Sequence, residues 1–236
     1  MHGVSCVAQR LFSLTQNFTH VLYDLALYPE YWSALREEVE EATNRDGWTK
    51  AAIDQMYKVD SFIKESQRLH PLGKGKFLCR SRVTFTIHLP FVLQLLVVLL
   101  RKTVQEYTFS NGAKVPPGVF IAISSTTHHD PEVFGDPSKF DGFRFVKMKA
   151  HAVMEGYPDK KFDMVTIDTH SLTFGYGRTA CPGRFLAASE LKMMLAYVIV
   201  TYDVKLVDGV SPSHWFMMQN CVPNRTAEVL FRKRRA

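Results

Sequence analysis

The sequence predicts a mainly α-helical fold with small β-sheets. Apolar residues recur at helical spacing in several segments, as expected for helices with one buried face. Two other regions, one near the middle and one at the C-terminus, alternate apolar and polar residues as strands do. Of the 236 residues, 46% are hydrophobic and 22% are charged, a globular composition that allows one large or two small domains.

Two helices are expected at the start of the chain. The first covers residues 11–27, where apolar side chains repeat at helical spacing. Pro29 can begin the second, because the first helical position needs no backbone N–H donor. This helix would turn an apolar stripe to the core and four glutamates to water; they are Tyr31, Leu35 and Val39, and Glu37, Glu38, Glu40 and Glu41.

Two shorter helices are expected next. Thr49 is a suitable N-cap for a helix that extends to Tyr57. Asp60 can cap another helix over residues 61–69. Pro71 ends this helix, because the residue before a proline is disfavoured in helical conformation.

The middle of the chain predicts a strand, a turn and a strand over residues 106–123, around the hairpin turn Asn111-Gly112. Residues 147–170 are polar and irregular, and we expect a loop there. A long amphipathic run over 185–202 predicts a helix.

The C-terminal residues predict a closing sheet, in which Val204 and Leu206 belong to one strand and residues 228–231 to another. Between them, residues 215–218 can line a pocket or belong to the core. A cluster of methionine and aromatic residues favours the core.

One cysteine, Cys181, lies in a glycine-rich turn just before the long helix, in the stretch Phe174-Gly175-Tyr176-Gly177-Arg178-Thr179-Ala180-Cys181-Pro182-Gly183-Arg184. The free N–H groups and the dipole of a helix start favour a thiolate, which is the form that binds metal. No second cysteine or histidine stands at ligand spacing, which argues against zinc. A metal that supplies its own equatorial ligands, such as haem iron, fits better.

This stretch resembles the haem-binding loop of cytochrome P-450 monooxygenases, whose pattern is F-x-x-G-x-[basic]-x-C-x-G. Phe174, Gly177, Cys181 and Gly183 fill the fixed positions. The resemblance implies a haem cofactor with Cys181 as the axial ligand of its iron, and Phe174, Gly177 and Gly183 as residues of the haem-binding loop.

One position departs from the family pattern. Thr179 stands where the family often has an arginine or histidine that binds a haem propionate. The resemblance therefore makes the neighbouring Arg178 a candidate for this contact, and Arg101 is a second candidate.

Glu65 and Arg68 are three positions apart and share one helix face. Alone, such a pair is usually an exposed ion pair of little energetic weight. Here it resembles the E-x-x-R motif of the family, and the surrounding residues 64–71 and His129-Asp130-Pro131 resemble its fungal members. The resemblance implies a buried structural lock of Glu65, Arg68 and a downstream arginine, for which Arg144 is the candidate. This lock would hold the loop that presents Cys181.

The resemblance covers the C-terminal half of a cytochrome P-450, so residues 1–236 are expected to be a partial domain. The helix over 11–27 resembles the second half of the long helix above the haem, and Ser13 and Thr15 are the candidates for proton delivery. The start of the chain lacks the basic-then-apolar pattern of a signal or anchor.

Residues 74–98 do not fit the family pattern, which resumes near Leu100. Our first hypothesis is a translated intron, because Gly73-Lys74 can be encoded by a common splice-donor sequence. The alternatives are a membrane-facing insertion and a buried helix. Residues 83–100 are long enough for a marginal membrane span, but polar residues and a proline interrupt them.

The resemblance implies a monooxygenase that inserts one oxygen atom of O₂ into a lipophilic small molecule. Its electrons would come from an NADPH-cytochrome P-450 reductase, and the intact relative would lie at the endoplasmic reticulum membrane. The net charge of +6 suits an acidic reductase surface. No basic stripe interleaved with aromatic residues indicates a nucleic-acid partner.

Two alternatives remain open. The chain can be a truncated, non-catalytic fragment that does not retain haem. It can also be an unrelated thiol enzyme with Cys181 as nucleophile, for which His170 is the nearest histidine in sequence. The four cysteines have no framework spacing, so disulfides do not organise the fold.

Overall fold

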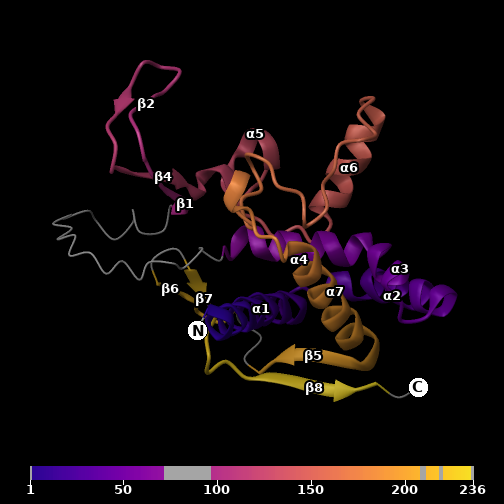
Figure 1. The fold of residues 1–236 in the computed structure, drawn as a ribbon. Helices are drawn as coiled ribbons and strands as arrows, with labels where there is room; N and C mark the ends of the chain where they lie inside the picture. Colours follow the sequence, from indigo (N-terminus) through magenta and orange to yellow (C-terminus); the bar gives the residue numbers. More distant parts are fainter. Residues whose placement is uncertain (1, 72–96, 208–210, 218–219, 235–236) are drawn as a thin grey trace.

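The computed structural model describes residues 2–71, 97–207, 211–217 and 220–234 (Figure 1). Its α-helices are α1 (His2–Leu27), α2 (Trp32–Asp46), α3 (Lys50–Asp54), α4 (Tyr57–Leu69), α5 (Pro131–Phe134), α6 (Arg144–Met154) and α7 (Arg184–Thr201). Its strands are β1 (Val97–Lys102), β2 (Tyr107–Thr108), β3 (Lys114–Val115), β4 (Phe120–Ser124), β5 (Tyr202–Leu206), β6 (Trp215–Met217), β7 (Asn220–Val222) and β8 (Val229–Lys233). Short 3₁₀ turns cover Pro29–Tyr31, Ser125–His129 and Gly177–Thr179.

The strands form small antiparallel pairs, β1 with β4, β2 with β3, β5 with β8 and β6 with β7. The β5–β8 ribbon is the predicted closing sheet, and β2 and β3 flank the predicted Asn111-Gly112 turn. The predicted class, mainly α with small β-sheets, is confirmed.

The core lies where α1, α2, α4 and α7 meet, and α7 contacts each of the other three (Figure 1). Leu25, Leu35, Phe62, Leu195 and Ile199 are inaccessible to solvent there. Burying each such side chain stabilises the fold by about 1.5–3 kcal/mol. The core therefore fixes α4, which carries Glu65, against α7, which follows the cysteine loop.

Several predicted helix boundaries were wrong. The first helix begins at His2 rather than residue 11, and Pro29 begins a 3₁₀ turn before α2. Thr49 does cap a helix, since its side chain accepts a hydrogen bond from Ala52 N, but that helix ends at Asp54.

The N-terminus of α4 is capped by another helix. Both carboxylate oxygens of Glu38 accept hydrogen bonds, from Lys58 N at 2.8 Å and Val59 N at 2.9 Å. Glu38 was predicted to face water, and Asp60 was predicted to be the cap. Asp60 instead lies inside α4, buried, and accepts from Met164 N at 2.7 Å. Sequence periodicity cannot detect a cap that comes from a different helix.

The loop predicted over residues 147–170 was partly wrong, because α6 extends from Arg144 to Met154. Phe145 and Ala152 on this helix are buried, and Phe145 N donates to Ser61 Oγ at 3.2 Å. Tertiary contacts with α4 thus stabilise this helix, which its polar composition did not predict.

The core position that we favoured for residues 215–218 was wrong for Trp215. The side chain of Trp215 is 51% exposed.

The proposed insertion over 74–98 lies outside the described residues, except that β1 begins at Val97. Across the described segments, no helix combines the length and hydropathy needed to cross a bilayer.

A buried polar cluster joins α1 to the end of α4 and to the β6–β7 hairpin. The rings of His20 and His70 stack with centroids 4.4 Å apart, and His20 Nε2 donates to the carbonyl of Cys221 at 3.0 Å. His70 Nδ1 lies 3.5 Å from Asp24 Oδ2. Burial raises the pKa of Asp24 to about 7 and lowers the pKa of His70 to about 3, so the two groups form a neutral pair in mildly acidic solution.

The Asp24→Asn variant tests this burial. The folded-state pKa of Asp24 lies above its ordinary value, so Asp24 binds a proton more tightly in the folded protein, and its contribution to stability falls as the pH rises from about 4 to about 7. The wild type loses this contribution as the pH rises, whereas the variant does not have it. We therefore expect the difference in unfolding free energy, variant minus wild type, to increase from about pH 4 to about pH 7 in urea titrations. A difference that is independent of pH would contradict the raised pKa.

Candidate functional site

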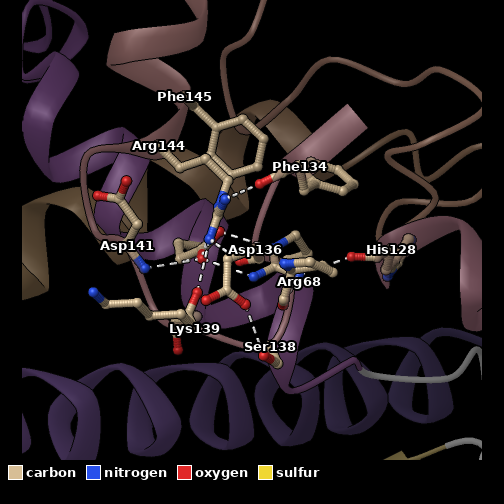
Figure 2. A network of polar contacts seen from close by, with 12 residues as sticks. Arg68, His128, Phe134, Asp136, Ser138, Lys139, Asp141, Arg144 and Phe145 are labelled. Atoms are coloured by element: carbon tan, nitrogen blue, oxygen red, sulfur yellow. Dashed lines mark hydrogen bonds and ion pairs between the residues drawn. The ribbon is translucent and has the colours of Figure 1, made fainter. Parts of the chain in front are cut away.

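A buried carboxylate on α4 binds two arginines from different parts of the chain, Arg68 and Arg144, which are labelled in Figure 2. Glu65 Oε1 accepts from Arg68 Nη2 at 2.8 Å and from Arg144 Nε at 3.0 Å, while Oε2 accepts from Arg68 Nε at 2.8 Å. Asp141 N donates to Oε1 at 3.1 Å. Glu65 is 0% exposed and the two arginines at most 8%. The structure thus brings together all three residues of the predicted lock, which we call the Glu65 network.

The remaining N–H groups of the arginines bind backbone carbonyls. Arg68 Nη1 donates to the carbonyls of His128 and Pro137, each at 2.8 Å. Arg144 donates to further carbonyls in the same region; they are those of Phe134, Asp136 and Lys139. The network therefore fixes the segment from residue 128 to residue 144 against α4.

Aromatic side chains exclude water from the network. The Arg68 guanidinium lies 5.1 Å from the centre of the Phe134 ring. Gly142 packs so closely that an added Cβ would lie 2.6 Å from the Phe62 ring. The sequence motif F-D-G-F-R-F is therefore explained by packing, since a larger residue at Gly142 would push against the core.

The cysteine loop reverses direction at glycines. Gly175 and Gly177 have φ angles of 73° and 63°, a conformation that other residues rarely adopt. Cys181 N donates to the carbonyl of Phe174 at 2.8 Å, which closes the loop. Phe174 packs against the core from a partly buried position. These residues of the predicted haem-binding loop are thus held by turn geometry and by one hydrophobic anchor.

The thiol of Cys181 is free and half-buried. It precedes α7, whose N-cap position is occupied by Gly183 rather than by the cysteine. The Cys181 carbonyl accepts from Arg184 Nη1 at 3.1 Å, which orients the backbone at the start of the helix.

Arg101 reaches the cysteine loop from β1. Its Nη2 donates to the Tyr176 carbonyl at 3.2 Å and to Thr179 Oγ1. Thr179 stands where the family often has a basic residue. Arg101 binds its hydroxyl and therefore brings a positive charge to this position. The other candidate, Arg178, is exposed on the 3₁₀ turn.

The two candidates for proton delivery lie in α1. Thr15 is exposed and Ser13 is half-buried. Their carbonyls accept hydrogen bonds one turn further along, from Thr19 Oγ1 at 2.8 Å and from Asn17 Nδ2 at 3.0 Å. Sequence reasoning missed the adjacent Gln16, which is 6% exposed and whose Nε2 has no hydrogen-bond partner among the described groups. No sequence signal distinguishes it from an ordinary surface glutamine.

The donor set fits a haem. Within the described segments, no three histidine, cysteine or acidic side chains gather as a metal site. A metal bound by Cys181 must therefore bring its other ligands. Hypothetical Cβ atoms on Gly177 and Gly183 would meet no atom within 4 Å, so both glycines leave the space beside the loop open.

The sequence is similar to that of known proteins. The family model described as cytochrome P450 matches residues 15–81 and 93–231. Cytochrome P450 monooxygenase 151 of Postia placenta is 39% identical over 219 residues, which cover 92% of this chain and 39% of that protein. Cytochrome P450 monooxygenase atmQ of Aspergillus flavus is 34% identical over 235 residues, which cover 98% and 40%. The chain thus spans about two fifths of the length of these curated relatives.

Removing the central carboxylate should strongly destabilise the chain. Glu65→Ala leaves two buried guanidinium groups without a counter-charge, which typically costs about 3–5 kcal/mol. The matched control is Asp54→Ala, which removes an exposed ion pair with Lys50 and should cost at most about 1 kcal/mol. Urea unfolding followed by circular dichroism measures both, and equal losses would contradict a special role for Glu65.

Proposed function

Because the chain belongs to the cytochrome P450 family, we propose that it forms the haem-thiolate part of a fungal monooxygenase. The observation that carries the proposal is the free thiol of Cys181, presented by a glycine turn with the Arg101 guanidinium bound to the same loop. A single thiol outside any cluster of three or more ligating side chains in the described segments suits a cofactor that brings its own equatorial nitrogens.

Each loop residue then has a distinct role. Cys181 would supply a thiolate ligand to the haem iron, and Phe174 anchors the loop in the core. Arg101 and Arg178 neutralise the carboxylates of the cofactor, while Gly177 and Gly183 leave room for its edge. When bound, a haem would supply the O₂ chemistry, and the Cys181 thiolate would donate electron density that favours cleavage of the O–O bond.

Proton supply falls to α1. We assign it to the hydroxyl of Thr15 or of Ser13, since both lie in the part of α1 that resembles the family's helix above the haem. The family usually has an acid–alcohol pair in this helix, but residues 10–20 contain no aspartate or glutamate. The hydroxyl alone would therefore pass protons from water.

The substrate and partners are those expected for the family. The substrate would be a lipophilic small molecule, and the curated relatives are named monooxygenases. The electron donor would be an NADPH-cytochrome P450 reductase, whose acidic surface suits the net charge of +6. The intact protein would act at the endoplasmic reticulum membrane, and the present chain would correspond to its C-terminal half.

Residues 74–98 would not belong to the functional domain. The family model leaves residues 82–92 unmatched but matches 74–81 and 93–98, so it supports the middle of the proposed insertion alone. If the segment is a translated intron, sequencing of the spliced transcript will show a message that lacks most of its codons. A mature message that retains these codons would contradict the hypothesis.

The second candidate is a non-catalytic fragment that does not retain haem. Large apolar side chains on α7 are exposed, among them Phe185 at 57%, Leu186 at 49% and Tyr197 at 54%. Exposed apolar side chains of this size suit a surface that another part of the protein covers, and without that part the chain would lack contacts that hold a cofactor.

The reduced, CO-bound absorption spectrum separates the two candidates. After haem is added to the purified chain, we expect the red-shifted band of thiolate ligation, and we expect Cys181→Ser to lose it. Cys221→Ala, which removes the buried thiol of the β6–β7 hairpin, should keep the band. Absence of haem retention by the wild-type chain favours the non-catalytic fragment.

A further inference from the structure

His128 connects the Glu65 network to the segment that leads to Cys181. Its carbonyl accepts from Arg68 Nη1 at 2.8 Å (Figure 2), and its Nε2 accepts from Leu172 N at 3.3 Å. Leu172 shortly precedes Phe174, the anchor of the cysteine loop. His128 is only 1% exposed, so both contacts lie inside the protein.

The contact with Leu172 fixes the tautomer of the His128 ring. A backbone N–H can only donate, so Nε2 must carry a lone pair, and the proton of the neutral ring lies on Nδ1. Burial, with smaller contributions from His129 and Arg68, lowers the pKa of His128 to about 4, and the ring is therefore neutral at neutral pH.

The Nδ1–H donor of His128 has no hydrogen-bond partner among the described groups, although it is buried. Buried donors are almost always paired, and an unpaired one is costly. His170 Nδ1 is in the same condition. Both residues also line one cavity, which points to a shared partner there that is not part of the polypeptide.

A small cavity lies beside both rings. Its volume is about 10 Å³, and its lining includes His128, His170, Ser171 and Thr173. This volume is about that of a single water-sized ligand. The two imidazoles and two hydroxyls supply the two to four polar partners that a buried water typically has.

Two cationic side chains also line the cavity, and each has a compensating acidic partner. Lys64 and Arg68 are both buried. Arg68 pairs with Glu65, while Asp168, Asp60 and Asp163 favour the charged form of Lys64. Asp60, the other buried carboxylate of α4, lies 3.5 Å from Lys192 and is compensated there.

We propose that this cavity binds one water molecule, which accepts from His128 Nδ1–H and joins His128 to His170. The bound acceptor completes a bridge from Arg68 through His128 to residues 170–173. It thereby ties the segment ahead of the cysteine loop to α4 independently of any cofactor.

A crystal structure of the full chain, grown once in sodium chloride and once in sodium bromide, tests the proposal. We expect an ordered peak within hydrogen-bond distance of His128 Nδ1. We expect no anomalous signal at this peak in the bromide crystals, which identifies a water, whereas an anomalous signal would identify a halide and overturn the assignment. A cavity without an ordered peak in both crystals overturns the proposal.

The same bridge can be measured in solution. Long-range ¹H–¹⁵N correlation spectra should show the Nδ1–H tautomer of His128, whereas an Nε2–H tautomer would overturn the proposal. In His128→Phe, the Leu172 amide loses its acceptor and should exchange with solvent at least about tenfold faster. His129→Phe changes the exposed neighbour and should leave this rate unchanged.

Discussion

The structure depends on one buried carboxylate, that of Glu65, which binds Arg68 through both of its oxygens and Arg144 through one. Buried ion pairs compensate for desolvation only when every donor is satisfied. Here the other N–H groups of Arg68 and Arg144 bind carbonyls between residues 128 and 139. One polar centre thus orders a segment without regular sheet contacts.

The order imposed by Glu65 extends towards the cysteine loop through short covalent and hydrogen-bonded steps. Arg68 holds the carbonyl of His128, and the His128 ring accepts from Leu172. Leu172 in turn lies next to the loop that Phe174 anchors and that the Cys181 amide closes. The thiol therefore occupies a position set partly by core packing around α7 and partly by the Glu65 network.

The sequence predicted what depends on local pattern and on motif. The helical periodicity, the Asn111-Gly112 hairpin and the cysteine loop were recognisable from the residues themselves. Contacts between distant segments were not: the capping of α4 by Glu38, the helix that starts at Arg144, and the ring contact of His128 each require the fold. A glutamate in a polar stretch looks the same in sequence whether it faces water or a helix end.

The central claim is that the Glu65 network positions Cys181 for haem ligation. The most direct test is a haem titration of Arg144→Lys, followed by the reduced, CO-bound spectrum. Lysine keeps the charge but loses the planar fork that binds Glu65 and the carbonyls together. The account predicts that this variant, if folded by circular dichroism, binds haem more weakly and loses much of the thiolate-type band. A folded variant with the wild-type affinity and spectrum would contradict it.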